Sequence, residues 1–318
     1  MMALTNSWKL AVLFAAVAFG QYVQTGAIGT VRKEEPVSVR PNYPFIPVEH
    51  WVGQRILFMP TLKSMQKFGY LDFAAPKGSR ADHPAYDEFV GKIARITAVR
   101  PRPASDKRDI VVEIEGTGQQ LIGTIDTYNS LGGILFLDEL DRARVDFIGK
   151  VLWLKVGTVG TYDPQTDKTG FMTAKKCGPL KVTNVLAGTG NIAPLRFIVT
   201  NQAGDEGYVD VAISGTNLSP IWDRMLAKDG LPRGLSFIDK RFFFSDPRKD
   251  HDWPSAVWAA IENETVDIGM TKEQVKFSLG EPKSINYTST AERSSEQWVY
   301  ERGSFVYFDG DIVKAIQN

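Results

Sequence analysis

The sequence predicts a multidomain chain in which two small all-β units precede a small α+β unit. Its 318 residues are enough for two or three domains. Short runs of β-branched and aromatic residues, separated by turn residues, recur from residue 51 to about residue 245. Beyond residue 250 the pattern changes to two helical segments followed by strands, which is typical of an α+β layer. Hydrophobic residues make up 43% and charged residues 23%, an ordinary balance for a protein with packed cores.

The charge and the rare residue types exclude several kinds of function. Lys+Arg and Asp+Glu both number 37, so the net charge is zero and a nucleic-acid partner is not expected. The single cysteine, Cys177, excludes an intrachain disulfide and a multi-cysteine metal site. With only three histidines, histidine-rich metal or triad chemistry is not expected either. No cofactor is predicted.

The N-terminus carries the pattern of an export signal. The apolar run Leu10–Phe19 follows a weakly positive start and is too short for a membrane-spanning helix, which needs about 20 residues. Ala18 and Gly20 are small residues suited to signal-peptidase cleavage, so residues 1–20 are predicted to be a signal peptide. The alternative is a buried N-terminal helix. We therefore expect an exported protein, periplasmic if the source is a Gram-negative bacterium. No cysteine follows the run, so no lipid anchor is expected. No second apolar run of that length occurs, so no transmembrane span is expected in the mature chain.

A proline-rich linker and a duplicated β unit are predicted next. Residues 21–47 are polar and contain four prolines, which favours an extended linker. The segment Trp51–Gln54 then matches Phe147–Lys150 in its order of aromatic, β-branched, glycine and polar residues. An offset of 86 aligns further strand residues: Ile96 with Val182, Val99 with Val185, Val112 with Ile198, Ile122 with Tyr208, and Ile125 with Val211.

The two copies are predicted to cover residues 48–145 and 146–245. Their opening strands differ by 96, so the first copy has about ten additional residues, including a short helical turn expected within Thr61–Tyr70. The mixed-charge segment Asp138–Asp146 is expected to be a solvated link between the copies. Each copy has about five short strands with a long excursion after the first, and in this it resembles an SH3-like barrel. An OB-type barrel and one larger sandwich are the alternatives.

Aromatic residues of the two copies could line a groove for peptides or cell-wall material. The alternative is that they fill the cores. The candidate groove residues are Trp51, Tyr70, Tyr128, Trp153 and Tyr162.

The third unit, residues 246–318, contains residues that are typical of helix caps. Asp252 is a candidate N-cap for a helix with Pro254 in its first turn. Thr271 and Gln274 form a capping box for a second helix. Gly280 supplies a left-handed C-terminal residue for that helix. Three or four strands follow, and an Asp309-Gly310 hairpin turn is predicted between the last two.

This unit resembles the SmpA/OmlA (BamE-like) family. The resemblance covers about a fifth of the chain and is carried by Gly269, Met270, Thr271, Gln274, Val275, Gly280, Pro282, Trp298, Tyr300 and Phe308. It implies a two-helix-plus-meander fold and a non-enzymatic accessory role beside proteins and lipid of the outer membrane. The family's best-known member is a lipoprotein of the outer-membrane assembly machine, whereas this chain lacks a lipidated cysteine and has two β units before the module. The same motif residues could act only as caps and core.

No constellation for catalysis is apparent. The glycine-rich segment Gly116–Thr124 lacks the lysine of a phosphate-binding loop and is predicted to be a hairpin. Neither a nucleophile elbow nor a zinc-binding His-Glu-x-x-His helix occurs. Asp246, Asp250, His251 and Asp252 could hold a divalent cation, but their spacing matches no calcium loop and a charged loop is the alternative.

The sequence therefore predicts a non-enzymatic exported protein with a binding or scaffolding role in the cell envelope or outer membrane. Its expected partners are envelope proteins or cell-wall material. Two alternatives stay open: a cell-wall or peptide-binding protein that acts through the barrels, and an enzyme of unrecognised type.

Overall fold

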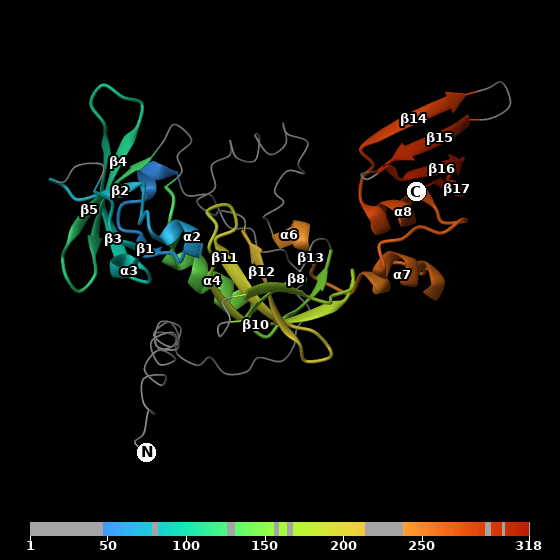
Figure 1. Cartoon of the computed structure of the whole chain (residues 1–318), viewed down its shortest axis with the longest axis horizontal. Helices are drawn as coiled ribbons and strands as arrows, with labels where there is room; N and C mark the ends of the chain where they lie inside the picture. Colours follow the sequence, from blue (N-terminus) through green and yellow to red (C-terminus); the bar gives the residue numbers. More distant parts are fainter. Residues whose placement is uncertain are drawn as a thin grey trace, which may run out of the picture.

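The computed structural model describes residues 47–77, 82–125, 131–155, 159–163, 168–213, 238–289, 294–300 and 303–317. The predicted signal peptide, nearly all of the predicted linker and Tyr128 lie outside these ranges. The described residues are mostly β, with few and short helices, and form three antiparallel sheets of six, seven and four strands (Figure 1). Among them, no helix combines the length and apolar character needed to cross a lipid bilayer.

The first sheet has the strand order β2-β5-β4-β3-β1-β6. Its elements in chain order are η1 (Val48–His50), β1 (Arg55–Phe58), α2 (Lys63–Gln66), β2 (Phe73–Ala74), α3 (Tyr86–Phe89), β3 (Ile93–Pro101), β4 (Arg108–Ile114), β5 (Gln120–Ile125) and β6 (Ile134–Phe136). Helix α2 is the short helical turn predicted after the first strand. The glycine-rich segment joins β4 to β5 as a hairpin, also as predicted, with left-handed Gly116 and Gly118 in its turn.

The second sheet has the order β13-β7-β10-β11-β12-β8-β9. Its strands are β7 (Val151–Leu154), β8 (Val159–Asp163), β9 (Lys168–Met172), β10 (Pro179–Ala187), β11 (Leu195–Thr200), β12 (Glu206–Val211) and β13 (Phe242–Phe243). The short helix α6 (Ile238–Arg241) leads into β13. Read in reverse and without β9, this order matches that of the first sheet: β8, β12, β11, β10, β7 and β13 correspond to β2, β5, β4, β3, β1 and β6.

Hydrogen bonds repeat between the two sheets along with the strand order. Gly53 and Gly149 both have positive φ, and their amides donate at 2.8 Å to the carbonyls of Ile96 and Val182, respectively. A bulge in β3 between Ile96 and Ala98 recurs in β10 between Val182 and Asn184. The offset of 86 therefore holds for β3. It also holds for β5, because Leu121 lies opposite Val112 and Gly207 lies opposite Val199.

One predicted pair was wrong. The register places Val112 opposite Ile96, and it places Val199 opposite Val182, so Val112 corresponds to Val199 and not to Ile198. The offset in the middle strand is 87 because the loop before β11 is one residue longer than the loop before β4. Burial agrees with this correction, since Val112 and Val199 are both fully buried.

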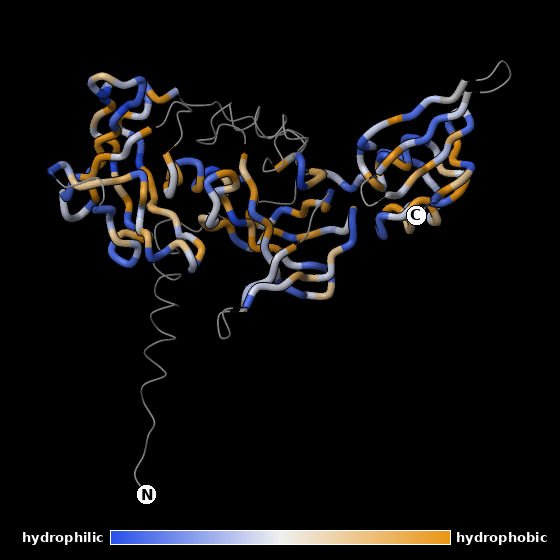
Figure 2. Tube along the Cα trace, turned by 45° about the horizontal axis from the view of Figure 1, so that its top comes forward, coloured by the Kyte–Doolittle hydropathy of each residue, from blue (hydrophilic) through white to orange (hydrophobic). Residues whose placement is uncertain are grey.

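Helix α4 (Leu137–Phe147) joins the two β units, and the predicted solvated link was wrong. Leu140, Ala143 and Phe147 recur at helical spacing and are buried, so the helix has an apolar stripe despite its many charges. The helix contacts β1 and β6 of the first sheet and β10 of the second. Side chains of Leu57, Met59 and Leu135 accordingly belong to the same core cluster as the second sheet. Each of the three units contains hydrophobic segments along its chain (Figure 2), and buried residues of each unit form a core cluster.

The C-terminal unit packs two helices on a four-stranded meander. Its elements are η2 (Pro247–Lys249), α7 (Ser255–Glu262), α8 (Lys272–Leu279), β14 (Ser284–Ser289), β15 (Ser294–Val299), β16 (Phe305–Asp309) and β17 (Ile312–Gln317). The capping box is confirmed: the Gln274 amide donates to Thr271 Oγ1 at 3.2 Å, and the Thr271 amide donates to Gln274 Oε1 at 2.9 Å. The predicted start of the first helix was wrong, because Pro254 rather than Asp252 occupies the N-cap position.

Candidate binding site at the junction before the C-terminal unit

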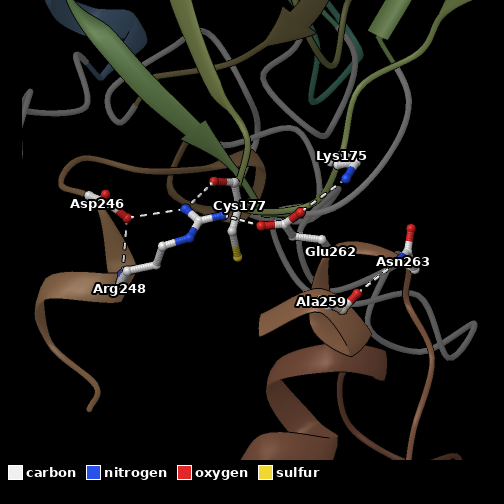
Figure 3. Close-up of polar contacts among 7 residues, drawn as sticks. All are labelled: Lys175, Cys177, Asp246, Arg248, Ala259, Glu262 and Asn263. Carbon is white, nitrogen blue, oxygen red and sulfur yellow. Dashed lines mark hydrogen bonds and ion pairs between the residues drawn. The ribbon is translucent and has the colours of Figure 1, made fainter. Parts of the chain in front are cut away.

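The second sheet and the C-terminal unit meet at a junction that combines buried and partly buried polar bonds with aromatic packing. The turn that contains Lys175, Lys176 and Cys177 lies just before β10, and the connection from β13 through η2 leads to α7. Figure 3 shows how the side chains from the turn, η2 and α7 converge. Because these elements are distant in sequence, the junction exists only in the folded chain.

Arg248 is the centre of the polar part. Its Nη2 donates to Glu262 Oε1 at 2.5 Å, and its Nη1 donates to the carbonyl of Cys177 at 3.0 Å and to Asp246 Oδ1 at 3.3 Å (Figure 3). Lys175 Nζ contacts the other Glu262 oxygen at 3.3 Å. Burial alone would raise the pKa of Glu262, but the bonds from Arg248 and Lys175 outweigh it and lower that pKa. The carboxylate is therefore held in its charged form between two cations.

In contrast to the exposed Lys175, the side chains of Lys176 and Cys177 are buried between the second sheet and the C-terminal unit. Lys176 is 7% exposed, and its Nζ donates to the carbonyl of Ser278 in α8 at 2.6 Å. Burial lowers the pKa of this amine. Cys177 has a left-handed backbone (φ 57°) and is fully buried in the core of the C-terminal unit. Burial raises the pKa of its thiol to about 11, so the thiol is protonated and poorly suited to nucleophilic chemistry.

An aromatic cluster adjoins this polar network, formed by Phe243, His251, Trp253, Trp258 and Phe277. Trp253 is its hub, with ring centroids 4.2 Å from His251, 5.1 Å from Trp258 and 5.2 Å from Phe277. Phe277 in turn stacks on Phe243 at 5.2 Å, with the two ring planes 7° apart. Strand β13 thereby contacts helix α8 directly through side chains.

The aromatic cluster is only partly covered. Trp258 is buried, whereas His251, Trp253, Phe277 and Phe243 are half-buried. Two cations lie over its rings: the guanidinium of Arg248 is 5.4 Å from the centroid of Trp258, and Lys155 Nζ is 4.6 Å from that of Phe243. Partly exposed aromatic rings edged by cations are common at protein-binding surfaces. The aromatic cluster is therefore the candidate binding site of the junction.

A second aromatic surface lies toward the β8-β9 edge of the second sheet, at the opposite end of the strand order from β13. It is formed by Tyr162, Phe171 and Tyr208 and is here called the outer aromatic face. Phe171 is 76% exposed and Tyr162 is 47% exposed. The register places Phe171 and Tyr208 opposite Gly160, so the three residues share one face of the sheet. The guanidinium of Arg196 lies 3.9 Å from the centroid of Tyr208 and is held there by two bonds to Asp210.

The predicted groove residues do not come together as one groove. Trp51 and Tyr70 are core residues of the first unit, 1% and 4% exposed, and so they cannot offer a ligand their rings; their assignment to a groove was wrong. Burial is favoured for Trp51 by edge-on packing against Phe136 and for Tyr70 by its hydroxyl bond to the carbonyl of Met59 at 2.8 Å. Trp153 is half-buried in β7. Tyr162 is exposed, as a surface role requires, and Tyr128 is outside the described residues.

The family-motif residues occupy the caps and the core of the C-terminal unit. Thr271 caps α8, Gly280 ends it with φ 84°, and Gly269 has φ 95° in the loop before it. Pro282 lies half-buried in the turn before β14. The remaining motif residues are buried: Met270, Gln274, Val275, Trp298, Tyr300 and Phe308. Trp298 and Phe308 pack together with centroids 4.6 Å apart, so the motif specifies the fold of this unit.

Pattern reading from the sequence missed the junction. Arg248 and Phe277 were not singled out, although the density of aromatic residues between Phe242 and Trp258 was a signal for the cluster. Asp246 and His251, two of the residues considered for a divalent cation, instead bond Arg248 and stack on Trp253. Within the described ranges no three or more His, Cys, Asp or Glu side chains gather as a metal ion would need.

Comparison with known proteins gives no relative to set beside this geometry. A scan against protein-family models and searches of curated proteins and of solved structures return no match for the chain.

Proposed function

We propose that this chain is a non-enzymatic exported protein of the cell envelope that scaffolds and binds envelope partners. The observation that carries the proposal is the packing at the first junction between the three units and the polar bonds at the second. Helix α4 shares a core with both sheets, and Lys176 and Arg248 tie the second sheet to the C-terminal unit. Units joined in this way present their surfaces at fixed positions, which is what a scaffold needs.

We also propose finer identities for the units. The adjacency of the first and last strands, β1 and β6, and the β3-β4-β5 meander favour SH3-like barrels for the first two. Two helices followed by a four-stranded meander favour a BamE-like fold for the third. The apolar run Leu10–Phe19 is the support for export, and we expect the mature chain to begin at Gln21.

A second candidate function rests on the outer aromatic face. Exposed Phe171 and Tyr162 on one face of the second sheet are suited to stacking on a peptide or a sugar ring of the cell wall. This would place binding in the second barrel and not at the junction.

One experiment compares these candidates. The tagged full chain is expressed in a Gram-negative host, the envelope is fractionated, and in-cell crosslinks are identified by mass spectrometry. We expect a processed, exported chain whose protein partners are lost in Trp253→Ala and retained in Phe171→Ala. The opposite pattern, or recovery with cell-wall material alone, would favour the second candidate. A cytoplasmic location would refute both.

A further inference from the structure

Strand β14 is an open edge of the four-stranded sheet. It ends the strand order β14-β15-β16-β17 and lies at the outer edge of the C-terminal unit (Figure 1). All six of its residues pair with β15 without a bulge. Among the described residues, none pairs with its outer side. An edge strand presents a row of unpaired amide and carbonyl groups to any further strand.

The other sheet edges are shorter or covered. Strands β2 and β13 have two residues each, and β6 has three buried ones. The opposite edge of the same sheet, β17, is partly covered by the loop before α8. The Gly269 amide donates to the Val313 carbonyl at 3.0 Å, and the Val313 amide donates to the Met270 carbonyl at 2.9 Å. Strand β9 has five residues, with Lys168 at its start and Gly170 at its centre. Strand β14 has neither charge, proline nor glycine to discourage pairing.

The side chains of β14 would match those of a second β14 strand paired with it antiparallel. Ile285 lies opposite the buried Trp298 and so is on the helix-covered face of the sheet. Tyr287, two residues further on, shares that face and is 69% exposed. When two β14 strands run antiparallel with Asn286 at the centre, Ile285 of each copy lies opposite Tyr287 of the other. Both exposed tyrosines then gain an apolar cross-strand neighbour.

We infer that β14 pairs with β14 of a second copy of this chain, with Asn286 opposite Asn286. The two four-stranded sheets become one continuous sheet with the helices of both copies on the same face. This dimer does not depend on the proposed binding role, since neither the aromatic cluster nor the outer aromatic face takes part in it.

A disulfide trap tests the pairing in the full-length purified chain. Opposite residues of antiparallel strands have Cα atoms about 4.5–5.5 Å apart, within the range of about 4.4–6.8 Å that a disulfide spans. The only native cysteine, Cys177, is buried and does not interfere. Under mild oxidation we expect Asn286→Cys to become mostly a covalent dimer. The matched control is Ala315→Cys on β17, which is also exposed and is expected to remain monomeric.

Charge reversal at the same position tests the register. Like charges directly opposite each other are unfavourable, so Asn286→Lys and Asn286→Glu should each weaken dimerisation by up to about fivefold in sedimentation analysis. Mixing the two variants should restore a heterodimer, and Ala315→Lys should leave the dimer intact. Circular dichroism checks that each variant is folded.

Two results would overturn the inference. One is a wild-type chain that sediments as a monomer at the highest concentration reached, together with an Asn286→Cys variant that crosslinks no more than Ala315→Cys. That pattern would leave β14 as an edge for an extended peptide from another protein. The other is a dimer that is unaffected by either charge at position 286, which would place the interface elsewhere.

Discussion

Replacing Glu139 with methionine should stabilise the chain, because its carboxyl group is buried without compensation. Glu139 is 1% exposed in the first turn of α4, and neither of its oxygens has a hydrogen-bond partner in the described structure. Burial raises its pKa well above the ordinary value, although the charge of Arg142 acts in the opposite direction. At neutral pH the folded chain must therefore keep this acid protonated or bury an unpaired charge.

The expected gain follows from the groups involved. An unpaired buried polar group costs about 1–3 kcal/mol. A methionine of similar shape removes that cost and adds a small stabilisation from burying apolar surface. Loss of the carboxylate's attraction to Arg142 reduces this stabilisation. We expect Glu139→Met to raise the free energy of unfolding by about 1–3 kcal/mol at pH 7. For a cooperative unit of about 200 residues this corresponds to roughly 2–4 °C in Tm per kcal/mol.

The pH dependence of this gain has a definite sign. Below about pH 4.3, the carboxyl is protonated in both folded and unfolded chains, and its titration costs nothing. As the pH rises, the unfolded chain ionises first, so the wild-type chain loses stability until the raised pKa of the folded state is passed. The advantage of Glu139→Met should therefore be smallest at pH 4, where only an unpaired neutral carboxyl is removed, and should grow toward neutral pH.

Thermal unfolding of both full-length chains across this pH range is the assay. Asp141→Asn on the same helix is the control: Asp141 is exposed and paired with Arg144, so its effect should stay within about 0.5 kcal/mol. A Glu139→Met variant that is less stable at pH 7, or whose advantage does not change with pH, would refute the reasoning. It would mean that the carboxyl is compensated in the folded chain.

Three further predictions concern the C-terminal unit and its junction. Arg248→Ala should destabilise the chain by about 1–3 kcal/mol in urea unfolding, because Glu262 loses its closest cation, whereas Lys249→Ala at the exposed neighbouring position should have little effect. Thr271→Ala should cost about 1 kcal/mol through loss of the N-cap bond, and Thr271→Ser should recover most of it. Cys177, with a thiol pKa of about 11, should resist alkylation at pH 8 in the native chain and react fully in denaturant; rapid native labelling would show that the junction opens.

The sequence was informative wherever the signal is local. The capping box at Thr271 and Gln274 was readable because its two partners are three residues apart. The duplication was readable because strands of equal length keep their spacing, and only the longer loop before β11 shifted the alignment by one. Helix α4 was missed because its charges outnumber its apolar residues, and the narrow stripe of Leu140, Ala143 and Phe147 gains its meaning only between two sheets.

The junction could not be predicted in the same way. Lys176 and its acceptor Ser278 are 102 residues apart, and Arg248 joins groups from three different segments. No periodicity or spacing records such contacts. The groove assignment of Trp51 and Tyr70 failed for a related reason: an aromatic residue in a short strand has the same local pattern whether it faces the core or solvent.

The duplication explains why the two junctions are built alike. Leu57 in β1 corresponds to Trp153 in β7 at the offset of 96. Leu135 of β6 lies opposite Leu57, and Phe243 of β13 lies opposite Trp153, so β6 corresponds to β13. In each copy the aromatic residue after this position, Phe136 or Phe244, packs on the aromatic residue that precedes the first strand, with centroids 5.1 Å and 6.5 Å apart.

The chain then leaves each sheet through the same strand and enters a helical segment that contacts the next unit: α4 after β6, and η2 with α7 after β13. The second junction is thus a counterpart of the first in which Arg248 and the aromatic cluster take the place of the apolar stripe of α4. The second junction removes less apolar surface from water than the first, because its aromatic cluster is only half-buried. We therefore expect the C-terminal unit to separate from the second β unit before the two β units separate from each other. Thiol labelling would test this order, since the side chains of Cys177 and Ala143 are both fully buried, one at each junction. Cys177 should label faster than the added thiol of Ala143→Cys.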